Sequence, residues 1–138
     1  MFNNQNKKDK KKLIFTTTSL LLKTASSDQI IKKEELDIIK EIICDFFTID
    51  IEEANLTISE AVELNKESID LFEAGSYVNE ALSLQDKIDF ILCIYEVAYI
   101  DDNLDFLERH VINQILNILN INKEQIKSIQ KDVRGKLL

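Results

Sequence analysis

The chain has 138 residues, with no proline, two glycines and a net charge of −8. This length suits one domain with a substantial core. Residues 1–12 carry +4 and residues 123–138 carry +3, so residues 13–122 carry −15. A body this acidic repels phosphate backbones, which excludes nucleic-acid binding by the body and makes cations the favoured small partners.

Apolar residues recur at spacings of three and four along most of the chain, and few helix breakers interrupt them. This pattern predicts an all-α fold, a compact bundle of about seven helices. Residues 1–10 are polar and basic and are expected to be a disordered tail, whereas residues 11–135 are expected to form a single helical domain. The helices are expected over about 11–26, 33–47, 51–64, 69–82, 84–99 and 105–120, with a last one from about 122.

Three residues are expected to cap helices, because each has a side-chain oxygen just before a periodic apolar segment: Asp50, Ser68 and Ser83. The segment that follows Ser68 carries the apolar residues Ile69, Phe72, Val78 and Leu82, which are expected to face the core. Gly75 could instead split this segment into two short helices.

No motif indicates catalysis, since the sequence has no nucleophile with a plausible base and no glycine-rich phosphate loop. The protein is therefore expected not to be an enzyme. Cys44 and Cys93 lie in apolar runs without metal-ligand spacing, which predicts core thiols and a reducing, cytoplasmic location. His110, the one histidine, is expected to face solvent.

The start of the chain superficially resembles a secretory signal, a basic segment followed by an apolar one. The apolar run is interrupted by Thr16, Thr17, Thr18 and Ser19, so we expect it to be a helix of the domain instead. No stretch approaches the roughly 20 apolar residues of a transmembrane helix.

An internal repeat relates two stretches 73 residues apart, TASSDQIIKKEE (24–35) and VAYIDDNLDFLE (97–108). The matching pairs are Ala25 with Ala98, Asp28 with Asp101, Ile31 with Leu104 and Glu35 with Glu108. The aliphatic matches continue over the next dozen residues, with a shift of one residue near Phe47. The pattern predicts two related units, each a helix, an acidic turn and a second helix.

The second turn concentrates the chemistry, because Asp101, Asp102, Asp105 and Glu108 lie within eight residues. Carboxylate oxygens suit Ca²⁺, Mg²⁺ or Mn²⁺ rather than zinc. The spacing of Asp105 and Glu108 is equally typical of a helix cap, in which Asp105 caps the helix and Glu108 bonds back to its start. Both roles use the same oxygens, and the pattern alone leaves both open.

The first turn is a poorer candidate for a cation. It keeps Asp28 and Glu35, but Lys32 and Lys33 lie between them. An EF-hand is not supported in either turn, because the ligand spacing and the central glycine of that loop are missing.

The two stretches ASSDQIIKKEE and AYIDDNLDFLE resemble the TerB-like (tellurite-resistance TerB) family, whose two helical repeats each carry the signature A-x-A-D-G-x-[IV]-x-x-x-E. The resemblance covers about residues 13–130. It implies a compact all-α fold that binds a divalent metal at acidic turns in cytoplasmic or membrane-associated stress-response systems. By position, the implied ligands are Asp28 and Glu35, then Asp101, Asp105 and Glu108. The glycine of the signature is Gln29 in the first turn and Asp102 in the second.

The sequence supports two possible functions, cation binding and protein or membrane interaction. The first is a non-enzymatic TerB-like domain that binds a divalent cation, Ca²⁺, Mg²⁺ or Mn²⁺, in a tellurite or stress-response role. The alternative is a metal-free scaffold whose acidic face or basic tails contact a partner protein or an anionic membrane surface. The sequence does not determine the oligomeric state.

Overall fold

The structure is a computed structural model that describes residues 4–25, 31–64, 70–98 and 106–122, together with residues 124, 125, 127 and 128. These residues form helices and their connections without a strand, which confirms the predicted all-α fold. The helices are α1 (Asn4–Ala25), α2 (Lys33–Phe47), α3 (Ile51–Leu64), α4 (Leu71–Ala81), α5 (Leu84–Ala98) and α6 (Phe106–Ile118). Residues 124, 125, 127 and 128 are also helical, where the sequence predicts the last of about seven helices. In this part of the chain, no helix is both long and apolar enough to cross a membrane.

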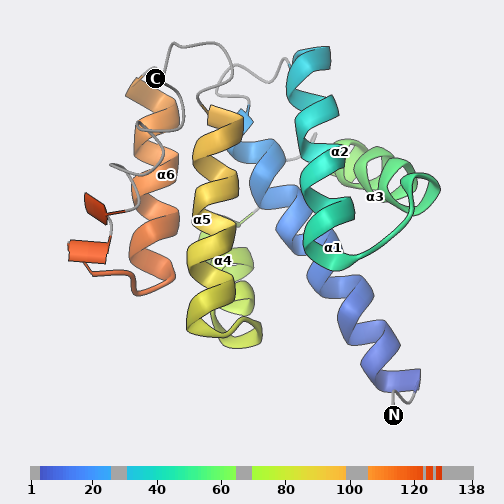
Figure 1. Cartoon of the computed structure of the whole chain (residues 1–138), viewed down its shortest axis with the longest axis horizontal. Helices are drawn as coiled ribbons and strands as arrows, with labels where there is room; N and C mark the ends of the chain where they lie inside the picture. Colours follow the sequence, from blue (N-terminus) through green and yellow to red (C-terminus); the bar gives the residue numbers. More distant parts are fainter. Residues whose placement is uncertain are drawn as a thin grey trace.

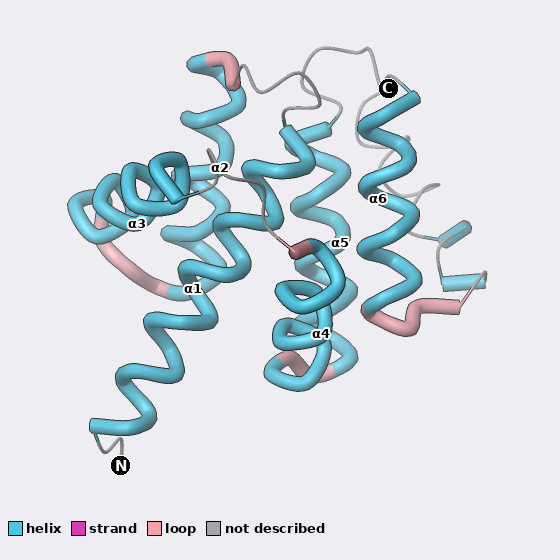
Figure 2. Tube along the Cα trace, turned by 180° about the vertical axis from the view of Figure 1, so that it is seen from behind, coloured by secondary structure: helices cyan, strands magenta, loops and turns pink. Residues whose placement is uncertain are grey.

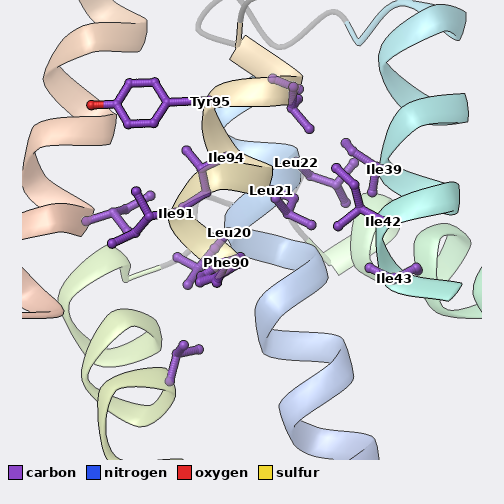
Figure 3. Packing of buried hydrophobic residues seen from close by; sticks show 14 of the residues in the cluster. Leu20, Leu21, Leu22, Ile39, Ile42, Ile43, Phe90, Ile91, Ile94 and Tyr95 are labelled. Carbon is purple, nitrogen blue, oxygen red and sulfur yellow. The ribbon is translucent and has the colours of Figure 1, made fainter. Parts of the chain in front are cut away.

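Helix α1 is the centre of the bundle (Figure 1), and it contacts each of the other five labelled helices. Residues 17–22 of α1 are all buried, and six consecutive residues cover the full circumference of a helix. Leu20, Leu21 and Leu22 lie between the isoleucines of α2 and the apolar face of α5 (Figure 3). Burying each of these leucines contributes roughly 1.5–3 kcal/mol, so α1 holds the two halves of the bundle together.

Hydroxyl side chains share this buried part of α1. Thr18 donates a hydrogen bond from Oγ1 to the carbonyl of Ile14 at 2.7 Å, and Thr24 donates to the carbonyl of Leu20 at 2.9 Å. These bonds satisfy both hydroxyls within the helix, so that the two threonines can be buried without a large desolvation penalty.

The N-terminal end of α1 differs from the prediction. The helix begins at Asn4, so it includes residues 4–10, which the sequence analysis assigned to a disordered tail. Two contacts hold α1 against α4: the Tyr77 hydroxyl donates to the carbonyl of Asp9 at 3.3 Å, and the Lys12 Nζ lies 4.5 Å from the Tyr77 ring centroid. Lysine is a good helix former, so a basic segment extends a helix once its neighbouring turns are packed.

Helix starts follow the predicted caps at two of three positions. The Asp50 Oδ1 accepts from the backbone N–H of Glu53 at 2.8 Å, and the Ser83 Oγ accepts from the N–H of Asp86 at 3.2 Å. The third predicted cap, Ser68, lies outside the described residues. Helix α4 starts after Asp70, whose side chain accepts from the N–H of Glu73.

The later start of α4 also corrects its predicted core face. Val78 and Leu82 are buried as expected, but Phe72 is 70% exposed. The face that packs inward carries Leu71, Gly75, Val78 and Leu82, spaced by three and four residues, and Phe72 lies off that face.

Helix boundaries recur at the offset of the predicted repeat. Helices α1 and α5 end at Ala25 and Ala98, and α2 and α6 begin at Lys33 and Phe106, so both pairs of boundaries are 73 residues apart. The two helix pairs therefore break at equivalent places in the sequence, although the structural equivalence of the whole units stays a prediction.

The ends of α2 and α6 are also built alike. Thr48 and Asn120 adopt positive φ angles of 54° and 57°, and they are the two non-glycine residues with positive φ in the described part of the chain. Beyond them, the Ile49 N–H donates to the Cys44 carbonyl at 3.2 Å, and the Ile121 N–H donates to the Leu116 carbonyl at 3.3 Å. A left-handed residue followed by such a bond is how helices commonly end.

Close packing of α4 against α6 depends on Gly75. A Cβ atom at this position would lie 2.7 Å from Ile118 Cγ2, which is closer than van der Waals contact allows. The glycine therefore sets how closely the two helices approach.

We expect Gly75→Ala to destabilise the fold, although alanine in an exposed helix is normally about 1 kcal/mol more favourable than glycine. Overpacking against Ile118 should cost about 1–3 kcal/mol, so the net destabilisation should reach about 2 kcal/mol. In an Ile118→Ala background the same change should be neutral or stabilising, because the clashing methyl group is gone. Urea denaturation of the four proteins measures this coupling, and equal effects of Gly75→Ala in both backgrounds would contradict it.

Tyr77 should contribute stability in a pH-dependent way. Burial, and secondarily the charge of Asp9, raise the pKa of the Tyr77 phenol above its ordinary value of 10.0. Folding therefore favours the neutral phenol, and its contribution is complete below that value and lost as the pH rises through the folded-state pKa. Between about pH 9 and 11, the wild type should lose more stability than Tyr77→Phe in chemical denaturation. If the stabilities of the two proteins change equally with pH, Tyr77 has the same pKa in the folded and unfolded chains, which would contradict the prediction.

Candidate functional site

The helix ends that flank the two predicted turns lie at one end of the bundle. Figure 1 shows the C-terminal ends of α1 and α5 and the N-terminal ends of α2 and α6 at the top of the molecule. Both repeats therefore direct their connection to the same end. The connecting residues 26–30 and 99–105 are outside the described residues, and so are Asp28, Asp101, Asp102 and Asp105.

Glu35 is the predicted ligand whose side chain the structure describes. It is 5% exposed, and its Oε1 accepts a hydrogen bond from the backbone N–H of Lys32 at 3.2 Å. A negative charge in the first turn of α2 also interacts favourably with the helix dipole. Glu35 thus fulfils the capping role, with one carboxylate oxygen bonded to its own helix.

The surroundings of Glu35 are poorly suited to a divalent cation. Lys32 and Lys33 precede it at the start of α2, and both are exposed. A cation near Glu35 would have to compete with the Lys32 N–H for one oxygen and would be repelled by two ammonium groups. The described part of the first turn therefore fits a helix cap better than a metal site.

Glu108 occupies the equivalent place in the second unit. It is the third residue of α6, as Glu35 is the third residue of α2. The side chain of Glu108 is outside the described residues, so the structure places its backbone alone. The second turn differs from the first in the residues around it, since Asp105 replaces Lys32 and Phe106 replaces Lys33.

The described ranges contain no group of three or more His, Cys, Asp or Glu side chains that could hold a metal ion. His110 is exposed on α6, as expected. These ranges omit the residues of the second turn, so they do not test the predicted ligand set.

The two cysteines are thiols that are not bonded to each other. Both are half-buried and pack against the core. Burial, followed by the charges of Asp45 and Asp50 and partly offset by Lys40, raises the pKa of the Cys44 thiol. Cys44 is therefore protonated at neutral pH, which suits a packing residue rather than a nucleophile.

Sequence reasoning missed a surface groove between α1 and α3. Lys11, Lys12 and Phe15 line one side, and Glu53, Leu56 and others line the opposite side. A signal was present in the sequence, because Leu56 lies among glutamates on α3, away from the buried positions Ala54, Ile58 and Ala61.

Mutation of Glu35 tests its role as a helix cap. We expect Glu35→Ala to cost about 1–2 kcal/mol, because the Lys32 N–H loses its acceptor in a part-buried site. Glu35→Gln should cost less, since the amide oxygen can accept the same bond. The neighbouring Glu34 is exposed in the same turn, so Glu34→Ala is a matched control for the dipole effect. Equal destabilisation by Glu34→Ala and Glu35→Ala would contradict the capping role.

The family model described as Tellurite resistance protein TerB matches residues 15–131. No curated protein and no solved structure matches the chain. The matched residues include both predicted turns and all of α2 to α6.

Proposed function

The chain belongs to the TerB (tellurite resistance protein) family, and on this basis we propose that it is a non-enzymatic helical domain that binds a divalent cation at its second acidic turn. Asp101, Asp105 and Glu108 would supply the ligands, and the role would be a cytoplasmic one in tellurite or another stress response. Asp28 and Glu35 would contribute less.

The density of carboxylates in the second turn carries this proposal. Four acidic residues in eight give a set of hard oxygen ligands, with no lysine among them. In the first turn, by contrast, Glu35 is committed to the start of α2 and two lysines lie beside it. The difference between the turns supports a cation at the second rather than at both.

The chemistry of the donor set suits Ca²⁺, Mg²⁺ or Mn²⁺. All of the implied ligands are carboxylates, which bind hard cations through oxygen. A bound cation would also offset part of the negative charge that residues 13–122 concentrate. By attracting carboxylates near the end of α5 and the start of α6, the cation would hold together the two helices that the turn joins.

The alternative is a metal-free scaffold that contacts a partner protein or an anionic membrane surface. The groove between α1 and α3 supports a protein partner, because it exposes an apolar residue among charges. In this case Asp105 and Glu108 would cap α6, as Glu35 caps α2.

A cation titration with matched variants distinguishes the two functions. With metal stripped beforehand, millimolar Ca²⁺, Mg²⁺ or Mn²⁺ should raise the melting temperature of the wild type. A ligand that binds the folded state alone stabilises it by roughly 2.7 kcal/mol at a hundredfold excess over its dissociation constant. Asp101→Asn and Asp105→Asn should abolish the rise, and Asp28→Asn should reduce it less.

The design separates ligation from capping. Asparagine caps a helix about as well as aspartate, so Asp105→Asn should leave the stability of the metal-free protein almost unchanged. Asp45 is exposed near the C-terminal end of α2, away from the turns, and Asp45→Asn controls for the loss of one negative charge. A wild type whose melting temperature does not respond to any of the three cations would reject the metal function and favour the scaffold.

A further inference from the structure

Helix α3 lies at the edge of the bundle, where it packs against α1 and α2. Figure 2 shows α3 beside α1, with the N-terminal half of α1 continuing past it. Between the two helices lies a groove of about 640 Å³. The edge position leaves the outer side of α3 and this groove open on the surface.

The two walls of the groove carry charged and apolar side chains. The α1 wall provides Lys11 and Lys12, and the α3 wall provides four carboxylates, those of Asp50, Glu52, Glu53 and Glu60. Apolar side chains from both helices line the groove as well: Ile14, Phe15 and Leu56. Carboxylates outnumber amines by four to two, so the groove as a whole is acidic.

Leu56 is the central feature of the α3 wall. It is 65% exposed, and Glu52 and Glu60 lie one turn before and one turn after it on the same face of α3. A leucine bracketed by glutamates presents an apolar contact and two charges to the same partner. This is the arrangement that a helix with an apolar stripe and basic flanks would complement.

We propose that the α1–α3 groove is a docking site for a basic amphipathic helix of a partner protein. One apolar residue of that helix contacts Leu56 and Phe15, and its lysines or arginines pair with Glu52 and Glu60. The lining residues of α3 run from 50 to 60, about 15 Å along the helix axis, which accommodates roughly three turns of the partner.

Charge selects this partner over other occupants. Residues 13–122 of a second copy carry −15, and an anionic membrane surface is negative too, so the acidic wall repels both. A basic helix is attracted by the same field and by the −15 of residues 13–122. The proposal does not depend on a cation at the second turn.

The test uses a synthetic helical peptide with leucines along one face and lysines elsewhere. Its binding to the full chain is followed by fluorescence anisotropy in the presence of a chelator, so a failure of cation binding has no bearing on the result. Leu56→Gln should weaken binding about tenfold or more, because the apolar anchor is lost. Glu60→Lys should weaken it and reduce its dependence on salt, because an attractive charge becomes repulsive.

Matched control variants exist outside the groove. Leu84 is 56% exposed on α5, and Glu80 is exposed on α4. Leu84→Gln and Glu80→Lys repeat the same chemical changes and should leave the affinity within about twofold. All four positions are exposed, so melting temperatures should show that each variant folds.

Three outcomes would overturn the proposal. Groove variants that bind as well as the control variants would show that the peptide is held by overall charge alone. Equal binding of a peptide with glutamates in place of the lysines would exclude charge recognition. Concentration-dependent dimers in sedimentation that disappear in Leu56→Gln would assign the groove to a second copy of this chain.

Discussion

Burial of α1 on all sides is the constraint on which the other helices depend. Residues 17–22 are covered completely, and a helix buried around its whole circumference needs neighbours in every direction. The chain supplies five of them, and α2 and α5 provide the isoleucines that enclose Leu20 to Leu22 (Figure 3). Two hydroxyls in this segment, Thr17 Oγ1 and Ser19 Oγ, have no hydrogen-bond partner among the described atoms, so apolar packing must offset their desolvation.

The same constraint determines where the acidic turns are attached. Because α2 and α5 both flank the C-terminal half of α1, the ends of α1 and α5 and the starts of α2 and α6 lie together. The carboxylates of two turns 73 residues apart in the sequence are thus connected to one end of the bundle. The N-terminal half of α1 extends from the opposite end and forms a wall of the groove.

The sequence predicted the apolar part of this fold well. Helix α2 has the expected bounds of Lys33 and Phe47, because its isoleucines recur regularly and Thr48 ends the helix in a left-handed conformation. The start of α1 was predicted poorly, because a lysine-rich segment has no apolar residues to bury. This part of α1 contacts α4 through the bond between Tyr77 and the Asp9 carbonyl, 68 residues apart, which local patterns do not reveal.

For the candidate site, the sequence identified the residues better than their roles. Glu35 was identified by its place in the repeat, but the pattern could not tell a cap from a ligand. The hydrogen bond from the Lys32 N–H to the Glu35 Oε1 favours the cap at that position. The groove could not be predicted, because it depends on how α3 crosses α1. Phe72 was predicted to face the core, and it is exposed because α4 begins later than its apolar pattern indicates.

The two proposed sites are far enough apart to act separately. The second turn joins α5 to α6 at the end of the bundle where α1 also ends, at Ala25 (Figure 1). Ala25 lies ten residues after Phe15 in the groove, on the order of 15 Å along α1. The Debye length is about 8 Å at physiological ionic strength, so the charge of a bound cation is largely screened at that distance. A cation at the turns should therefore change the affinity of a basic helix little. Coupling between the two would require a movement of α1, which its packing against five helices resists.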